Sequence, residues 1–223
     1  MVEYMVGHTF RYHLASDEMW NMKRQHKWKQ LESGESVLPL AHDRTIGILG
    51  LGQLGNACAE ALLNLNFCVL GWSRTTKKND HLNGNFHHYY GIDGLDNVLQ
   101  KSDVLILLLP NTKETFNIIN KITLSKCKRG VAIINAGRGT LIDDDALLEA
   151  LDVGIVSGAT LDVFKVEPLP KEHGYWNHPK VLITPHNAAN TRSNTASAVV
   201  VENIRRSEYN EPLLYVVDRE HGY

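Results

Sequence analysis

The stretch Gly50-Leu51-Gly52-Gln53-Leu54-Gly55, preceded by the apolar run 45–49, decides the fold of this 223-residue chain. The run predicts a strand, and residues 53–65 have the spacing of a helix. A G-x-G-x-x-G motif between a strand and a helix is typical of a turn that holds a dinucleotide. We therefore expect Gly50, Gly52, Gln53, Leu54 and Gly55 to bind phosphate groups. The alternative is a tight turn whose glycines serve packing alone.

The three glycines have different tasks in such a turn. The first permits the sharp bend, the second lets a pyrophosphate approach the backbone, and the third lets helix and strand pack closely. The N-terminus of the following helix adds unpaired N–H groups and a partial positive charge, both of which attract phosphate.

Outward from this motif, short apolar runs alternate with helical segments. Further strands are expected at 67–72, 103–109, 130–135, 156–163 and 181–184, and further helices at 94–101 (with Asp93 as its cap), 122–128, 143–151 and 190–209. Residues 2–29 also have helical spacing. The alternation predicts an α/β fold, a doubly wound and mostly parallel Rossmann sheet with helices on both faces.

Composition excludes several classes of protein. Hydrophobic residues make up 43% and charged residues 22%, which suits a globular protein. The net charge of -2 does not favour a nucleic-acid partner, and no apolar run is long enough to cross a membrane. The three cysteines, Cys58, Cys68 and Cys127, lack metal-ligand spacing, so we expect thiols, a cytoplasmic protein and no metal site.

The end of the second strand indicates which dinucleotide binds. NAD enzymes place an acid there to bond the ribose 2′-hydroxyl. Here the sequence is Trp72-Ser73-Arg74-Thr75-Thr76-Lys77-Lys78, and no acid occurs before Asp80. Ser73, Arg74 and Thr75 would suit a 2′-phosphate instead, by charge and hydrogen bonding. We therefore expect NADP(H), with NAD as the less favoured cofactor and a solvated basic loop as the alternative.

Polar groups follow three later strands. They are Asn135-Ala-Gly-Arg-Gly139, Leu161-Asp-Val-Phe164 with Glu167-Pro168, and Thr184-Pro-His-Asn-Ala-Ala189. In an open parallel sheet, ligands bind at the carboxyl ends of the strands. One crevice should therefore collect these groups beside the glycine turn.

These motifs together resemble the D-isomer-specific 2-hydroxyacid dehydrogenases, over nearly the whole chain. Trp72-Ser73-Arg74, residues 176–179 and the ending at 217–223 are similar to the glyoxylate/hydroxypyruvate reductase A branch of that family. The resemblance implies reduction of a small 2-keto acid by NADPH to a D-2-hydroxy acid.

The resemblance also implies a role for individual residues. Arg138 would grip the substrate carboxylate and keto oxygen, His186 would protonate that oxygen, and Glu167 would pair with His186. Asp162 would lie near the nicotinamide amide, and the remaining cofactor contacts would be Pro110, Ala136, Gly137, Arg138, His186 and Ala188. Ketone reduction builds negative charge on oxygen, so a cation and a proton donor both lower its barrier. Taken singly, each residue could instead be an ordinary loop ion pair or a solvated group.

The family's domain order implies a division of this chain. Residues 1–36 would be the helix and arm that join two domains, 37–189 the NADP-binding domain, and 190–223 a C-terminal helix and tail. The family's preceding substrate-binding domain is not in the sequence. A fragment, a naturally shortened protein and a chain completed by a partner all remain open. Tyr4, Met5, Leu213, Leu214 and Tyr215 would then be exposed or join a homodimer contact.

Two functions follow from these observations. The first is a reductase, which the co-occurrence of Arg138, Glu167 and His186 favours. The second is an NADP(H)-binding sensor or interaction module without efficient catalysis, which the incomplete family architecture favours.

Overall fold

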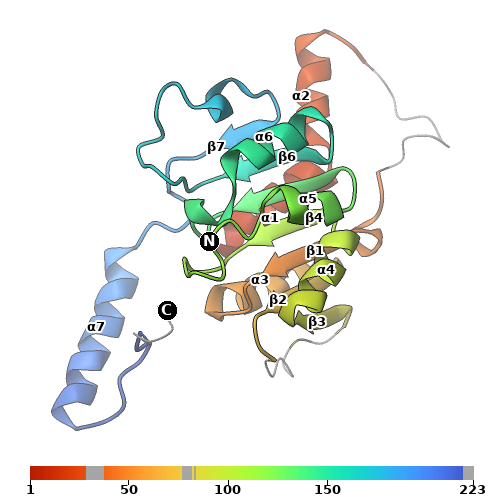
Figure 1. Ribbon diagram of the computed structural model, residues 1–223. Coiled ribbons are helices and arrows are strands. Elements are labelled where there is room, and N and C mark those ends of the chain that lie inside the picture. Colours follow the sequence, from red (N-terminus) through yellow and green to blue (C-terminus); the bar gives the residue numbers. More distant parts are fainter. Residues whose placement is uncertain (29–37, 77–81, 83, 218–223) are drawn as a thin grey trace.

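The computed structural model describes residues 1–28, 38–76, 82 and 84–217, and these form an α/β sheet structure (Figure 1). Within those ranges a seven-stranded sheet runs in the order β3-β2-β1-β4-β5-β6-β7. Every neighbouring pair is parallel. The strands are β1 (Thr45–Leu49), β2 (Cys68–Ser73), β3 (Phe86–Tyr90), β4 (Val104–Leu107), β5 (Val131–Asn135), β6 (Val156–Leu161) and β7 (Val181–Ile183). The strand order reverses between β1 and β4, which is where such sheets bind ligands.

Helices cover both faces of the sheet. On one face lie α1 (Val2–His13) and α3 (Gln53–Asn64), and on the other α4 (Gly91–Lys101), α5 (Lys121–Lys126) and α6 (Asp144–Asp152). Short 3₁₀ turns occur at Ala41–Asp43, Gly139–Leu141 and Gly174–Asn177.

The central strands are apolar throughout because each one serves two cores. In β4, Val104 and Ile106 pack toward α1 and α3, while Leu105 and Leu107 pack in the opposite core with α4, α5 and α6. All four side chains are at most 3% exposed. Two-sided burial explains the continuous apolar run that the sequence shows, and the predicted fold class is confirmed.

The structure corrects several local predictions. Strand β3 was not expected, and α4 begins at Gly91 with Tyr90 as its N-cap rather than at the predicted Asp93 cap. The helix predicted over residues 2–29 is two helices, α1 and α2 (Ser16–Arg24), because Ala15 adopts a left-handed conformation between them. Lys29 and the predicted boundary between residues 36 and 37 lie outside the described residues.

Helix α1 packs against the body of the sheet. Its side chain Met5 is fully buried beside α3, so the prediction that Met5 is exposed was wrong. The physical reason is that α1 places Met5 among the apolar groups of β1 and α3. Tyr4 is partly buried and lies at the site described below.

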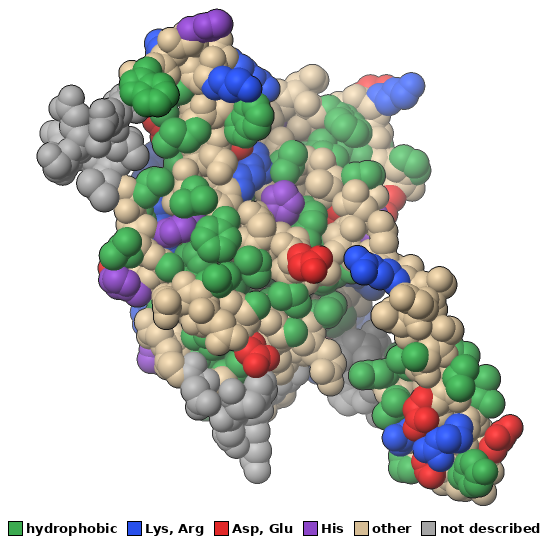
Figure 2. Space-filling view, turned by 180° about the vertical axis from the view of Figure 1, so that it is seen from behind, with side chains coloured by type: hydrophobic (Ala, Val, Ile, Leu, Met, Phe, Trp, Pro, Cys, Tyr) green, Lys and Arg blue, Asp and Glu red, His purple; other side chains and the backbone are tan. Residues whose placement is uncertain are grey.

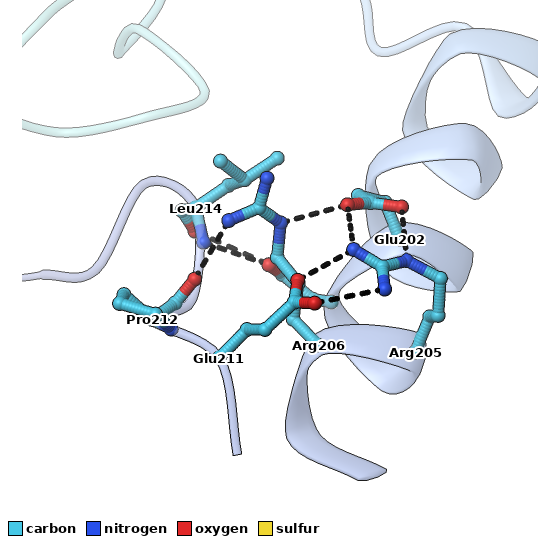
Figure 3. A network of polar contacts seen from close by, with 7 residues as sticks. Glu202, Arg205, Arg206, Glu211, Pro212 and Leu214 are labelled. Atoms are coloured by element: carbon cyan, nitrogen blue, oxygen red, sulfur yellow. Dashed lines mark hydrogen bonds and ion pairs between the residues drawn. The ribbon is translucent and has the colours of Figure 1, made fainter. Parts of the chain in front are cut away.

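Helix α7 (Ser193–Glu208) stands away from the sheet, and none of its residues is buried (Figure 1). The tail after it folds back along the helix. Arg205 forms ion pairs with Glu202 and Glu211 (Figure 3). Arg206 donates to Glu202 and to the Pro212 carbonyl. Asn203 is hydrogen-bonded to the backbone of Leu214. Seen from behind, this arm carries acidic, basic and apolar side chains together (Figure 2). Leu213 and Tyr215 are exposed as predicted, while Leu214 is half-buried.

No helix in the described ranges is both long and apolar enough to span a bilayer. Among the same residues, no group of three or more His, Cys, Asp or Glu side chains is arranged to hold a metal ion.

Candidate active site

A groove of about 730 Å³ opens over the carboxyl ends of β1, β2, β4 and β5. The predicted cofactor residues that line it are Gly50, Gly52, Gln53, Leu54, Gly55, Ser73, Arg74, Thr75, Pro110, Ala136, Gly137 and Arg138. Four segments that are distant in the sequence therefore meet along one groove. The other predicted residues, Asp162, Glu167, His186 and Ala188, do not line it.

The glycine turn fits a phosphate-bearing cofactor. Gly50 has φ of +111°, a conformation that favours glycine, and a Cβ on Gly55 would collide with the Gly50 carbonyl oxygen. A Cβ on Gly52, in contrast, would meet no protein atom within 4 Å, so the space beside it is open. Gly52 is also the N-cap of α3 and caps it with no side chain, which leaves the first N–H groups of the helix for a ligand.

The end of β2 forms one end of the groove. Ser73 is only 5% exposed, and its hydroxyl bonds the Thr75 carbonyl and His88 Nε2, each at 2.7 Å. Arg74 Nη1 lies 3.8 Å from Glu114 Oε2, a carboxylate carried by the loop after β4. Sequence reasoning missed Glu114, because no local pattern indicates that residues 74 and 114 face each other. Lys77, Lys78 and Asp80 lie outside the described residues.

His186 and Glu167 form a hydrogen-bonded pair. Nδ1 of His186 lies 2.7 Å from Glu167 Oε2, and Glu167 Oε1 accepts the backbone N–H of Phe164 at 2.9 Å. Partial desolvation acts to raise the pKa of Glu167. The hydrogen bonds from His186 and Phe164, together with the charges of His186 and Arg138, outweigh it and lower that pKa. Glu167 is thus held as a carboxylate that accepts Nδ1–H, which leaves Nε2 as the ring atom for proton transfer.

Arg138 is close both to this pair and to the groove. It lines the groove, and its charge is near enough to Glu167 to lower the pKa of that carboxyl. Nη1 of Arg138 donates to the Gly137 carbonyl at 2.7 Å, so one of the five guanidinium N–H groups is engaged within the loop. Arg138 is exposed, and the His186 side chain is 59% exposed, so both are open to a substrate.

Asp162 is the buried centre of the His186 turn. It is 1% exposed, and its carboxylate accepts the Thr184 hydroxyl and the backbone N–H groups of Asn187 and Ala188. These contacts position the turn. The predicted contacts of Asp162 and Ala188 with a nicotinamide ring stay predictions.

Known proteins are similar to this chain over its whole length. Residues 4–188 match the family model described as "D-isomer specific 2-hydroxyacid dehydrogenase, NAD binding domain". Glyoxylate/hydroxypyruvate reductase A of Photorhabdus laumondii is 40% identical over 223 residues, which are 100% of this chain and 68% of that protein. The enzyme of the same name from Yersinia enterocolitica is also 40% identical, over 224 residues that cover 100% of this chain and 68% of that protein.

Solved structures are also similar to this chain over its whole length. A D-isomer-specific 2-hydroxyacid dehydrogenase from Xanthobacter autotrophicus, in complex with NADPH and MES, superposes with a TM-score of 0.92 at 36% identity, covering 100% of this chain and 88% of that one. An NADPH-dependent glyoxylate/hydroxypyruvate reductase from Sinorhizobium meliloti, in complex with NADP and sulfate, has a TM-score of 0.91 at 35% identity, covering 100% and 69%.

Proposed function

The chain belongs to the D-isomer-specific 2-hydroxyacid dehydrogenases, a family of NAD(P)-dependent oxidoreductases, and we propose that it reduces a small 2-keto acid with NADPH. The substrate class is glyoxylate, hydroxypyruvate or a similar acid. The product is the corresponding 2-hydroxy acid, with the D configuration where that product is chiral. The observation that carries the proposal is the 2.7 Å pair of His186 and Glu167, whose carboxylate feels the charge of Arg138. Arg138 itself lines the groove that suits a dinucleotide.

In this proposal, each part of the cofactor has residues of the groove that would hold it. The N–H groups at the start of α3 and the space beside Gly52 would hold the pyrophosphate. Arg74 would hold the 2′-phosphate by a charge-assisted hydrogen bond, with Ser73 fixing the Thr75 backbone beside it. When bound, NADPH supplies the hydride that reduces the keto carbon.

Residues of the chain itself would bind the negative charge of the substrate and supply the proton to its keto oxygen. Arg138 has free guanidinium donors to bind the carboxylate of the substrate and to stabilise negative charge on its keto oxygen. Glu167 holds His186 through Nδ1, so the protonated ring donates from Nε2 to that oxygen.

Consumption of NADPH with glyoxylate or hydroxypyruvate tests the proposal, together with chiral analysis of the product from hydroxypyruvate. We expect turnover and the D-hydroxy acid. Absence of turnover, or formation of the L-hydroxy acid, would refute it.

A second candidate is an NADP(H)-binding module without efficient catalysis. It is favoured by the exposure of Arg138 and His186, because a reductase site gains from excluding water. Calorimetric titration with NADPH and NADH, run beside the turnover assay, separates the two. Binding of NADPH without turnover of either acid supports the module.

We also propose that the chain forms a homodimer. Val200, Val201 and Ile204 of α7 are each more than half exposed, and apolar side chains gathered on one helix are typical of contact surfaces. Sedimentation equilibrium at micromolar concentration would test this, and a monomer mass would contradict it.

A further inference from the structure

A hydrogen-bond chain connects α1 to the turn that carries His186. The Tyr4 hydroxyl lies 2.7 Å from Thr184 Oγ1, and Thr184 Oγ1 donates to Asp162 Oδ1 at 2.5 Å. A threonine hydroxyl has one proton, and here the Asp162 carboxylate takes it. Tyr4 must therefore donate to Thr184. Burial raises the pKa of Tyr4 to about 12, so the phenol keeps the proton that it donates.

Asp162 connects these hydrogen bonds to the backbone around His186. Its carboxylate accepts the N–H groups of Asn187 and Ala188, both at 2.9 Å, and its main-chain carbonyl accepts the N–H of His186 at 2.9 Å. His186 itself has φ of +52°, in the left-handed region that residues with a Cβ seldom adopt. Such a conformation persists only where the surroundings hold it.

We propose that Tyr4 is a positioning residue for His186, acting through Thr184 and Asp162 on the turn 184–188. The proposal rests on the proposed function, in which His186 is the proton donor. The relay holds the imidazole in its contact with Glu167. It also makes α1 a support for the catalytic turn, in addition to its packing against the sheet.

The chain supplies a matched control on the same helix. The Tyr12 hydroxyl lies 2.9 Å from Thr160 Oγ1, and burial raises the pKa of Tyr12 to about 12. Both tyrosines thus connect α1 to a threonine near the end of a neighbouring strand. Thr160 lies within β6, and its hydroxyl oxygen also accepts a hydrogen bond from Arg11 of α1. The Tyr12 contact therefore fixes the helix to the sheet, whereas the Tyr4 contact fixes the turn.

The experiment compares Tyr4→Phe with Tyr12→Phe in the full chain. Each variant removes one phenolic hydroxyl, so we expect similar losses of global stability in urea unfolding. Amide hydrogen exchange, measured by NMR without cofactor, reports directly how firmly the backbone N–H groups of the turn 184–188 are held. In Tyr4→Phe the amides of Asn187 and Ala188 should exchange about tenfold faster, as expected for the loss of one hydrogen bond that supports them. In Tyr12→Phe they should exchange at the wild-type rate.

Thr184 gives a second and independent comparison. Thr184→Ser keeps the hydroxyl and should leave the exchange rates of Asn187 and Ala188 close to wild type. Thr184→Val removes both links of the relay and should accelerate them at least as much as Tyr4→Phe. Equal exchange in the two tyrosine variants, or wild-type exchange in Thr184→Val, would overturn the proposal.

Turnover adds a readout that a purely structural role would not change. Tyr4→Phe should lower kcat several-fold with little change in the KM for NADPH, while Tyr12→Phe leaves kcat unchanged. An unchanged kcat in Tyr4→Phe would also overturn the proposal. Failure of the wild type to turn over any 2-keto acid would refute the proposed function, and the exchange experiment would still decide how the turn is held.

Discussion

The imidazole Nδ1 of His186 lies 2.7 Å from Glu167 Oε2, although the two residues follow different strands, β7 and β6. This contact fixes which ring nitrogen is engaged, and the catalytic account depends on it. A carboxylate in this position orients the ring through its Nδ1 atom.

Glu167→Gln removes the charge and keeps the shape of the side chain. We expect kcat/KM for the 2-keto acid to fall by about 100-fold, since a positioned general acid contributes on the order of 10²–10⁴ in rate. Steady-state kinetics with NADPH would measure it. Glu172→Gln, an exposed acid in the same loop, serves as the control. Equal rates in wild type and Glu167→Gln would contradict the role of the pair.

The lowered pKa of Glu167 predicts how the pair responds to pH. Because the folded-state pKa lies below its usual value of about 4.5, the pair stabilises the fold above that pH. The stabilisation is lost as pH falls through the folded-state value. Urea unfolding of wild type and Glu167→Gln should therefore show a difference in unfolding free energy that shrinks below about pH 4.5. A difference that grows on acidification would reverse the assigned direction.

Cofactor preference should depend on the facing pair Arg74 and Glu114. Arg74→Gln should weaken NADPH binding about 10-fold or more, because hydrogen bonds to charged groups contribute about 1.5–3 kcal/mol. NADH binding should change little. Glu114→Gln should strengthen NADPH binding by about two- to fivefold, since the carboxylate competes weakly for Arg74 across 3.8 Å. Calorimetric titration measures both, and tighter NADPH binding in Arg74→Gln would exclude the assignment.

Two glycines of the turn should respond to alanine in opposite ways. Gly52→Ala should leave stability unchanged and weaken NADPH binding at least tenfold, because its Cβ meets no protein atom and would fill the phosphate space. Gly55→Ala should cost about 1–3 kcal/mol of stability, since its Cβ collides with the Gly50 carbonyl. Thermal unfolding with and without NADPH separates the two effects. Loss of stability in Gly52→Ala would contradict the finding that the space beside Gly52 is open.

Most of the sheet could be predicted because two-sided burial imposes apolar runs on strands such as β4. Strand β3 could not be predicted, because it lies at the edge of the sheet and its sequence, Phe86-His87-His88-Tyr89-Tyr90, contains no apolar run. The break at Ala15 was also missed, because alanine is a strong helix former and nothing in the local sequence signals the left-handed conformation that it adopts here.

The candidate site could be predicted where residues follow strands, because the carboxyl ends of parallel strands share one edge. Gly52 and Arg138 were predicted in this way to share one groove, and both line it. Glu114 and Tyr4 were not, since each reaches the site from an element whose sequence carries no motif for it. Their roles follow from contacts across the fold, to Arg74 and Thr184.

The rate of NADPH consumption with glyoxylate, compared between wild type and His186→Gln, tests the whole account most directly. We predict that kcat/KM falls by at least about 100-fold in the variant, because the proton donor is lost, while the affinity for NADPH changes far less. Equal rates in the two proteins would contradict the assignment of His186 as the proton donor.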